Sequence, residues 1–145
     1  LGLGAKQLKK PWKTVCLMGD GECCEGSVWE AAMSAAHFKL DNIVGIVDRN
    51  RLMIDGCTED VMALEPFADK WRAFGWNVIE VNGHDLDELD CALDAAWKAE
   101  GKPTLILANT VKGKGVDFME NNVVYHYASG DSALCEKAKA SIMRG

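Results

Sequence analysis

A strand, a helix and a second strand within residues 14–56 constrain this chain most strongly. The apolar run Thr14–Met18 is followed by a helical pattern over Gly26–Phe38 and by a second apolar run, Ile43–Val47. Such continuous runs suit the strands of a parallel sheet covered on both faces. In a right-handed βαβ unit the two strands lie side by side, so both end at the same edge of the sheet. Open α/β sheets bind their ligands at that edge.

Oxygen-bearing side chains follow both strands. Asp20 lies between Gly19 and Gly21 after the first strand, and Asn50 follows the second. The glycines allow a sharp turn and a close approach to a ligand. A carboxylate, an amide oxygen and a carbonyl from the turn 51–53 would supply about three of the six oxygens around Mg²⁺. The spacing alone leaves open whether Asp20 binds a metal or caps a helix, and whether Asn50 is a ligand or a turn residue.

The rest of the chain alternates between helical and strand patterns. The expected elements are the helix Leu64–Phe74, the strand Asn77–Val81, the helix Asp85–Ala99 with Asp85 as its N-cap, the strand Thr104–Val111 and the helix Ser132–Met143. This alternation predicts an α/β fold, a doubly wound parallel sheet with helices on both faces. Without a linker rich in Pro, Gly or Ser, residues 1–145 are expected to form a single domain. Leu1–Lys10 resembles the end of a helix, so we expect the domain to lack its amino-terminal part.

Composition and charge argue against several classes of function. The formal net charge is −6, which argues against a nucleic-acid surface. No apolar run approaches the roughly 20 residues that span a bilayer, and nothing resembles a signal peptide, so the predicted location is the cytoplasm without a membrane partner. The six cysteines lack the paired spacing of structural zinc sites. Cys16 and Cys91 lie in apolar patterns and are expected to be core residues.

The segment GDGECCEGSVWEAAMSAAHFKLDNIVGIVDRN resembles the diphosphate-binding, amino-terminal part of transketolases, which are thiamine diphosphate-dependent enzymes. The similarity continues through AFGWNVIEVNGHDLDEL, GKPTLILANTVKGKGV and ENNVVYH and so covers nearly the whole chain. It implies a thiamine diphosphate-binding fold, present here as a fragment or as one half of a split enzyme.

The resemblance also implies roles for individual residues. The metal ligands for Mg²⁺ or Ca²⁺ would be Asp20, Asn50 and the carbonyl of Leu52. The implied cofactor-binding residues are Gly19, Asp20, Gly21, Glu22, Asn50, Ile54 and His126. His126 resembles a histidine that reaches the diphosphate and the reacting centre, but Tyr127 stands where the family usually has glycine.

Two acids and two lysines complete the candidates. Glu25 and Glu30 lie at the start of the first helix, where the helix dipole favours acids. In transketolases the matching acids link the two cofactor sites of a dimer through buried hydrogen bonds, which implies catalytic roles for both. Lys112 and Lys114 form a glycine-spaced turn that is either a simple loop or an electrostatic aid to a bound phosphate.

The implied activity is the transfer of a two-carbon ketol unit between sugar phosphates in the pentose phosphate pathway, with the carbanion chemistry supplied by the cofactor. The family takes its activating glutamate from a pyrimidine-binding domain. This chain is therefore expected to need a pyrimidine-binding C-terminal subunit or domain, within a homo- or hetero-oligomer. The alternatives are another thiamine enzyme, such as deoxyxylulose phosphate synthase, and a truncated cofactor-binding module without turnover. A receiver-like domain phosphorylated at Asp20 or Asp48 is disfavoured, because Lys102 precedes its strand and so lies at the wrong edge.

Overall fold

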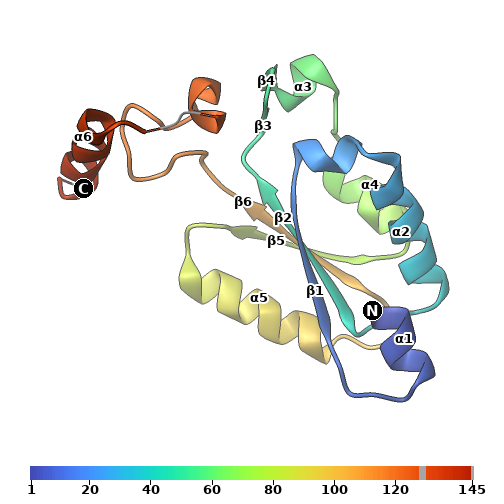
Figure 1. The fold of residues 1–145 in the computed structure, drawn as a ribbon. Coiled ribbons are helices and arrows are strands. Elements are labelled where there is room, and N and C mark those ends of the chain that lie inside the picture. The colour runs from blue at the N-terminus through green and yellow to red at the C-terminus, as the bar shows by residue number, and fades with distance from the viewer. Residues whose placement is uncertain (128–129, 145) are drawn as a thin grey trace.

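The computed structural model describes residues 1–127 and 130–144. Its centre is a parallel sheet with the strand order β1-β2-β6-β5 (Figure 1). These strands are β1 (Thr14–Gly19), β2 (Ile43–Arg49), β5 (Asn77–Asn82) and β6 (Thr104–Asn109). The predicted α/β fold with a parallel sheet is confirmed.

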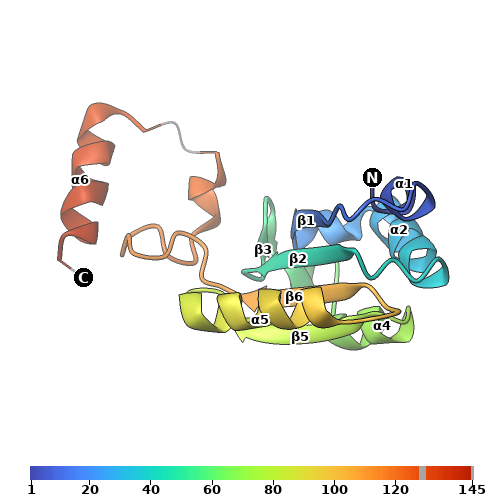
Figure 2. The ribbon, with the colours of Figure 1, turned by 90° about the horizontal axis from the view of Figure 1, so that it is seen from below.

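Helices cover both faces of this sheet. The longer helices are α2 (Gly26–His37), α4 (Phe67–Ala73), α5 (Leu86–Lys98) and α6 (Ser132–Ile142). α2 and α4 pack on one face, where Phe67 and Trp71 are buried against Val47. α5 packs on the other face, where Ala92 and Ala96 lie against Val44 and Ile106 (Figures 1 and 2). Because β6 lies between these two layers, its residues 104–108 are all buried.

The edge strand β1 is less covered than its apolar sequence predicts. Val15 and Leu17 pair in register with residues of β2 that face α5, yet they are 51% and 71% exposed. Cys16 is exposed as well, and Cys91 lies on the exposed side of α5. The expected cover on both faces is therefore wrong for β1, and so is the core position of these two cysteines. Cys23 is the buried cysteine instead.

Helix starts follow local chemistry. Asp85 caps α5 as predicted, and its side chain accepts two backbone N–H groups at 3.0 and 3.1 Å. α4 begins at Phe67, three residues later than expected. The reason is Pro66, whose ring disfavours the helical conformation at the preceding residue, Glu65. The amino-terminal helix α1 (Gly2–Gln7) is shorter than the segment Leu1–Lys10 in which a helix end was expected.

Small elements surround the carboxyl edge of the sheet. They are the antiparallel pair β3 (Leu52–Met53) and β4 (Gly56–Cys57), the helix α3 (Thr58–Val61), and the 3₁₀ turns η1 (Gly21–Cys24) and η2 (Val123–His126). Figure 1 shows β3, β4 and α3 beyond the ends of β1 and β2, with η2 and α6 beyond the end of β6. Within the described residues, no helix combines the length and the apolar character that crossing a membrane requires.

Candidate functional site

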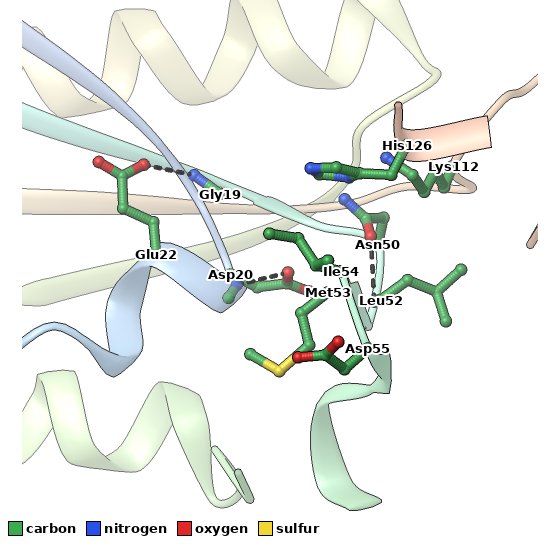
Figure 3. A pocket seen from close by; sticks show the side chains of 11 residues that line it. Gly19, Asp20, Glu22, Asn50, Leu52, Met53, Ile54, Asp55, Lys112 and His126 are labelled. Atoms are coloured by element: carbon green, nitrogen blue, oxygen red, sulfur yellow. Dashed lines mark hydrogen bonds between the residues drawn. The ribbon is translucent and has the colours of Figure 1, made fainter. Parts of the chain in front are cut away.

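A pocket of about 470 Å³ lies at the carboxyl edge of the sheet. It is formed by the turn after β1, the loop after β2 and two residues from beyond β6 (Figure 3). The sequence-predicted residues that it gathers are Gly19, Asp20, Gly21, Glu22, Asn50, Leu52, Ile54, Lys112 and His126. Segments up to about a hundred residues apart in sequence therefore converge on one cavity.

Asp20 is held rigidly although it lies in a turn. Its side chain is 1% exposed. The Oδ1 atom accepts the backbone N–H of Gly21 at 2.7 Å, which also caps η1. The Oδ2 atom accepts the backbone N–H of Arg51 at 2.6 Å and the Nη1 group of Arg49 at 3.1 Å. Asp20 is thus both a cap, of η1 rather than α2, and a wall of the pocket.

Asn50 lies beside Asp20 in the pocket. Its Oδ1 accepts the backbone N–H of Leu52 at 3.0 Å (Figure 3). Its Nδ2 donates to Asp48 at 3.3 Å. The left-handed residue of this loop is Arg51, with a φ of 66°, so Asn50 is not the left-handed turn residue, although its hydrogen bond to Leu52 forms an Asx turn. Among the described residues, the amide oxygen of Asn50 accepts this one N–H and has a second acceptor site for a ligand.

The sequence did not point to Arg49, which ends β2 and contacts Asp20 of the pocket. Its side chain is 1% exposed and donates to Asp20, to Thr58 at 2.9 Å, and to two glutamates. These are Glu65 at 2.8 Å and Glu59 at 3.3 Å. Burial alone would lower the pKa of Arg49, but the hydrogen bonds that it donates to Glu65 and Asp20 outweigh burial and raise that pKa. The available signal was an arginine two residues after the apolar run Ile43–Val47.

Three more side chains shape the rim. Glu22 accepts the backbone N–H of Gly19 at 3.1 Å, while Lys112 and His126 line the side nearest Asn50 (Figure 3). His84, which had no expected role at the site, accepts the backbone N–H of Val111 at 2.7 Å. It therefore fixes the backbone immediately before Lys112.

Glu25 and Glu30 lie outside this pocket. Both are exposed on or beside the first turns of α2, and the Glu25 side chain makes no capping hydrogen bond there. Their expected link between two cofactor sites requires a second protomer. The roles of these two acids therefore stay predictions.

The donor atoms in the pocket suit a hard cation. Among residues 1–127 and 130–144, no three His, Cys, Asp or Glu side chains gather into a metal centre. A cation would instead take the carboxylate of Asp20, the amide of Asn50 and the carbonyl of Leu52, a set of oxygens that fits Mg²⁺. Gly21 allows this arrangement, since a Cβ there would lie 3.0 Å from the Cβ of Met53.

Comparison with known proteins identifies the family. Residues 9–142 match the family model described as the thiamine diphosphate binding domain of transketolase. The chain belongs to the transketolase family. This confirms the resemblance seen in the GDG-to-Asn50 segment. The matched region includes both strands of the βαβ unit, the pocket and all of α6.

Relatives of this transketolase domain include proteins named as transketolase subunits. It is 44% identical over 138 residues to one subunit of the apulose-4-phosphate transketolase of Phocaeicola vulgatus, covering 95% of this chain and 49% of that protein. It is 48% identical over 110 residues to the SqwG subunit of the 6-deoxy-6-sulfo-D-fructose transketolase of a Clostridium species, covering 76% and 40%. The chain thus spans about half the length, or less, of these curated relatives.

Solved structures confirm the fold of this domain. The transketolase of Campylobacter jejuni superposes with a TM-score of 0.90 at 33% identity, over 98% of this chain and 23% of that one. The parallel sheet and its covering helices are therefore those of a transketolase.

Proposed function

We propose that this domain binds the metal-bridged diphosphate of thiamine diphosphate and, with a pyrimidine-binding partner, serves the transfer of a two-carbon ketol unit between sugar phosphates. One observation carries the proposal. Asp20, Asn50 and Leu52 meet in a single pocket at the carboxyl edge, and Lys112 lies on its rim. Oxygen ligands for a divalent cation and a positive charge for phosphate are the complementary halves of a metal-diphosphate site.

Each pocket residue has a proposed task. The Asp20 carboxylate, the Asn50 amide oxygen and the Leu52 carbonyl would hold Mg²⁺ or Ca²⁺. Gly19, Gly21 and Glu22 shape the turn around the diphosphate, and Lys112 offsets its charge. Ile54, which is 52% exposed at the pocket, offers an apolar surface to the cofactor ring.

Proton handling is assigned to His126. Its imidazole lies at the pocket rim on the side of Asn50 and Lys112 (Figure 3). A histidine there can hold a proton against a diphosphate oxygen or a reacting oxygen of the substrate. Thiamine diphosphate supplies the carbanion chemistry when it is bound. Glu25 and Glu30 would act across the contact between two cofactor sites.

A partner is part of the proposal. The family activates the aminopyrimidine with a glutamate from a separate domain, and the described residues contain a single parallel sheet. Two relatives are named as subunits, which supports a split enzyme. Cytoplasmic location and a place in the pentose phosphate pathway stay predictions.

Calorimetry and a ketol-transfer assay test the proposal together. We expect thiamine diphosphate to bind in the presence of Mg²⁺ and not after chelation of the metal. Turnover should appear only when a pyrimidine-domain partner is added. Binding that ignores the metal would refute the pocket assignment. Turnover by the chain alone would show that it carries the activating acid itself. Binding without turnover, even with the partner, would favour a non-catalytic cofactor-binding module.

A further inference from the structure

The two oxygens of the Asp20 carboxylate are not equivalent. Each carboxylate oxygen offers about two acceptor sites. Oδ2 uses both, for the backbone N–H of Arg51 at 2.6 Å and for Nη1 of Arg49 at 3.1 Å. In the described part of the chain, Oδ1 accepts one donor only, the N–H of Gly21 at 2.7 Å. One acceptor site of this pocket residue is therefore left for a ligand, and it belongs to Oδ1.

Further hydrogen bonds fix the position of Arg49 and so maintain the difference between the two oxygens of Asp20. Nη1 also donates to Thr58 at 2.9 Å, while Nη2 donates to Glu65 at 2.8 Å and to Glu59 at 3.3 Å. The planar guanidinium presents its donors in a rigid fork, so several simultaneous bonds fix its orientation.

The two glutamates are anchored in turn. Glu59 accepts the backbone N–H of Leu64 at 3.1 Å, and Glu65 accepts that of Phe67 at 2.8 Å. Arg49 thus connects the turn after β1 to the segment between α3 and α4. Neither glutamate lines the pocket, so neither is placed to coordinate a cation bound there.

We propose that Arg49 is a positioning residue that occupies Oδ2 of Asp20 and so restricts this carboxylate to binding a cation through Oδ1 alone. The inference rests on the proposed function, in which a divalent cation binds at Asp20. Mg²⁺ requires a near-octahedral shell, whereas Ca²⁺ accepts bidentate carboxylates and more ligands. By blocking the bidentate mode, Arg49 makes the site select Mg²⁺ over Ca²⁺.

The test replaces Arg49 in the full-length protein assembled with its pyrimidine-binding partner. Arg49→Met removes every donor and keeps a long stem, while Arg49→Lys keeps the charge without the fork. The control is Arg72→Met, because Arg72 is 45% exposed on α4 and pairs with Asp69 and Glu80 outside the pocket. Calorimetry gives the concentrations of Mg²⁺ and of Ca²⁺ that support half-maximal binding of thiamine diphosphate.

We expect Arg49→Met to shift the preference from Mg²⁺ toward Ca²⁺ by about tenfold or more, the lower end of the effect of residues that orient metal ligands. Arg49→Lys should shift it in the same direction by less, and it carries the test if circular dichroism shows Arg49→Met to be unfolded. Arg72→Met should keep the wild-type preference.

A purely structural Arg49 would weaken binding with both cations by the same factor, and that result would overturn the inference. So would an unchanged requirement for each cation. Cofactor binding by the wild-type protein that does not depend on either metal would overturn the proposed function itself, and the inference with it.

Discussion

Asp20→Asn is the substitution that tests the site most directly, because it removes one charge and preserves the size of the side chain. Both carboxylate oxygens of Asp20 accept hydrogen bonds, from Gly21 on one side and from Arg49 and Arg51 on the other. An amide has one oxygen and one NH₂ group, so in either orientation the NH₂ faces a donor. At least one buried donor is left without its acceptor.

The cost in stability can be bounded from the contacts. Breaking a buried ion pair costs roughly 3–5 kcal/mol, because one charge stays buried and unpaired. Arg49 still has Glu65 at 2.8 Å and Glu59 at 3.3 Å, which places the expected loss near the lower limit, about 3 kcal/mol. A domain of ordinary stability, about 5–15 kcal/mol, remains folded after such a loss. If only its place in a turn were considered, replacing Asp20 would be expected to lower stability only slightly.

Urea unfolding and calorimetry measure the two consequences. Asp69→Asn is the matched control, because the Asp69 side chain is 69% exposed and exposed ion pairs such as the one it forms with Arg72 contribute little to stability. We expect Asp20→Asn to abolish Mg²⁺-dependent binding of thiamine diphosphate. Unchanged metal-dependent affinity would refute the ligand role of Asp20. A stability loss no larger than that of Asp69→Asn would refute the buried-pair argument.

Other predictions address the rim, the acid range and the cysteines. His126→Ala should lower turnover of the assembled enzyme by about 10²-fold with little change in melting temperature, whereas His37→Ala, at another exposed histidine, should leave turnover normal. The hydrogen bond from Arg49 lowers the pKa of Glu65 below 4.5. The contribution of this ion pair to stability is therefore complete above about pH 4.5 and is lost as the pH falls through the lower pKa of Glu65 in the folded state. Glu65→Gln should flatten that part of an acid-unfolding curve. Burial raises the pKa of the Cys23 thiol to about 12, so alkylation near pH 8, followed by mass spectrometry, should modify the exposed Cys24 and spare Cys23.

The central unit could be predicted because its signals are local. The helix expected over Gly26–Phe38 is α2, which ends one residue earlier, and the strand expected at Ile43–Val47 is β2, which runs on to Arg49. The meeting of Asp20 and Asn50 then follows from topology, since parallel strands that are adjacent in the sheet end at the same edge. No knowledge of packing was needed for either step.

The late start of α4 has a local cause in Pro66, but for β1 and for the small strands β3 and β4 the missing information was tertiary. β3 and β4 have two residues each, too few for an alternation of polar and apolar side chains to be visible. The apolar residues of β1 indicate a strand, but hydropathy does not say which neighbours cover it. Leu17 belongs to this apolar strand and is nevertheless 71% exposed.

Arg49 is the clearest case of this limit. A charged residue after an apolar strand is normally predicted to lie in solvent, and Glu59 and Glu65, like most glutamates, are expected at the surface for the same reason. Burying a guanidinium is tolerated only when its charge is paired, and the acids that pair with Arg49 come from 10, 16 and 29 residues away. No local sequence pattern predicts that these side chains meet. The proposed metal ligands of this site are visible in a motif, whereas the residue proposed to orient one of them is visible only in the fold.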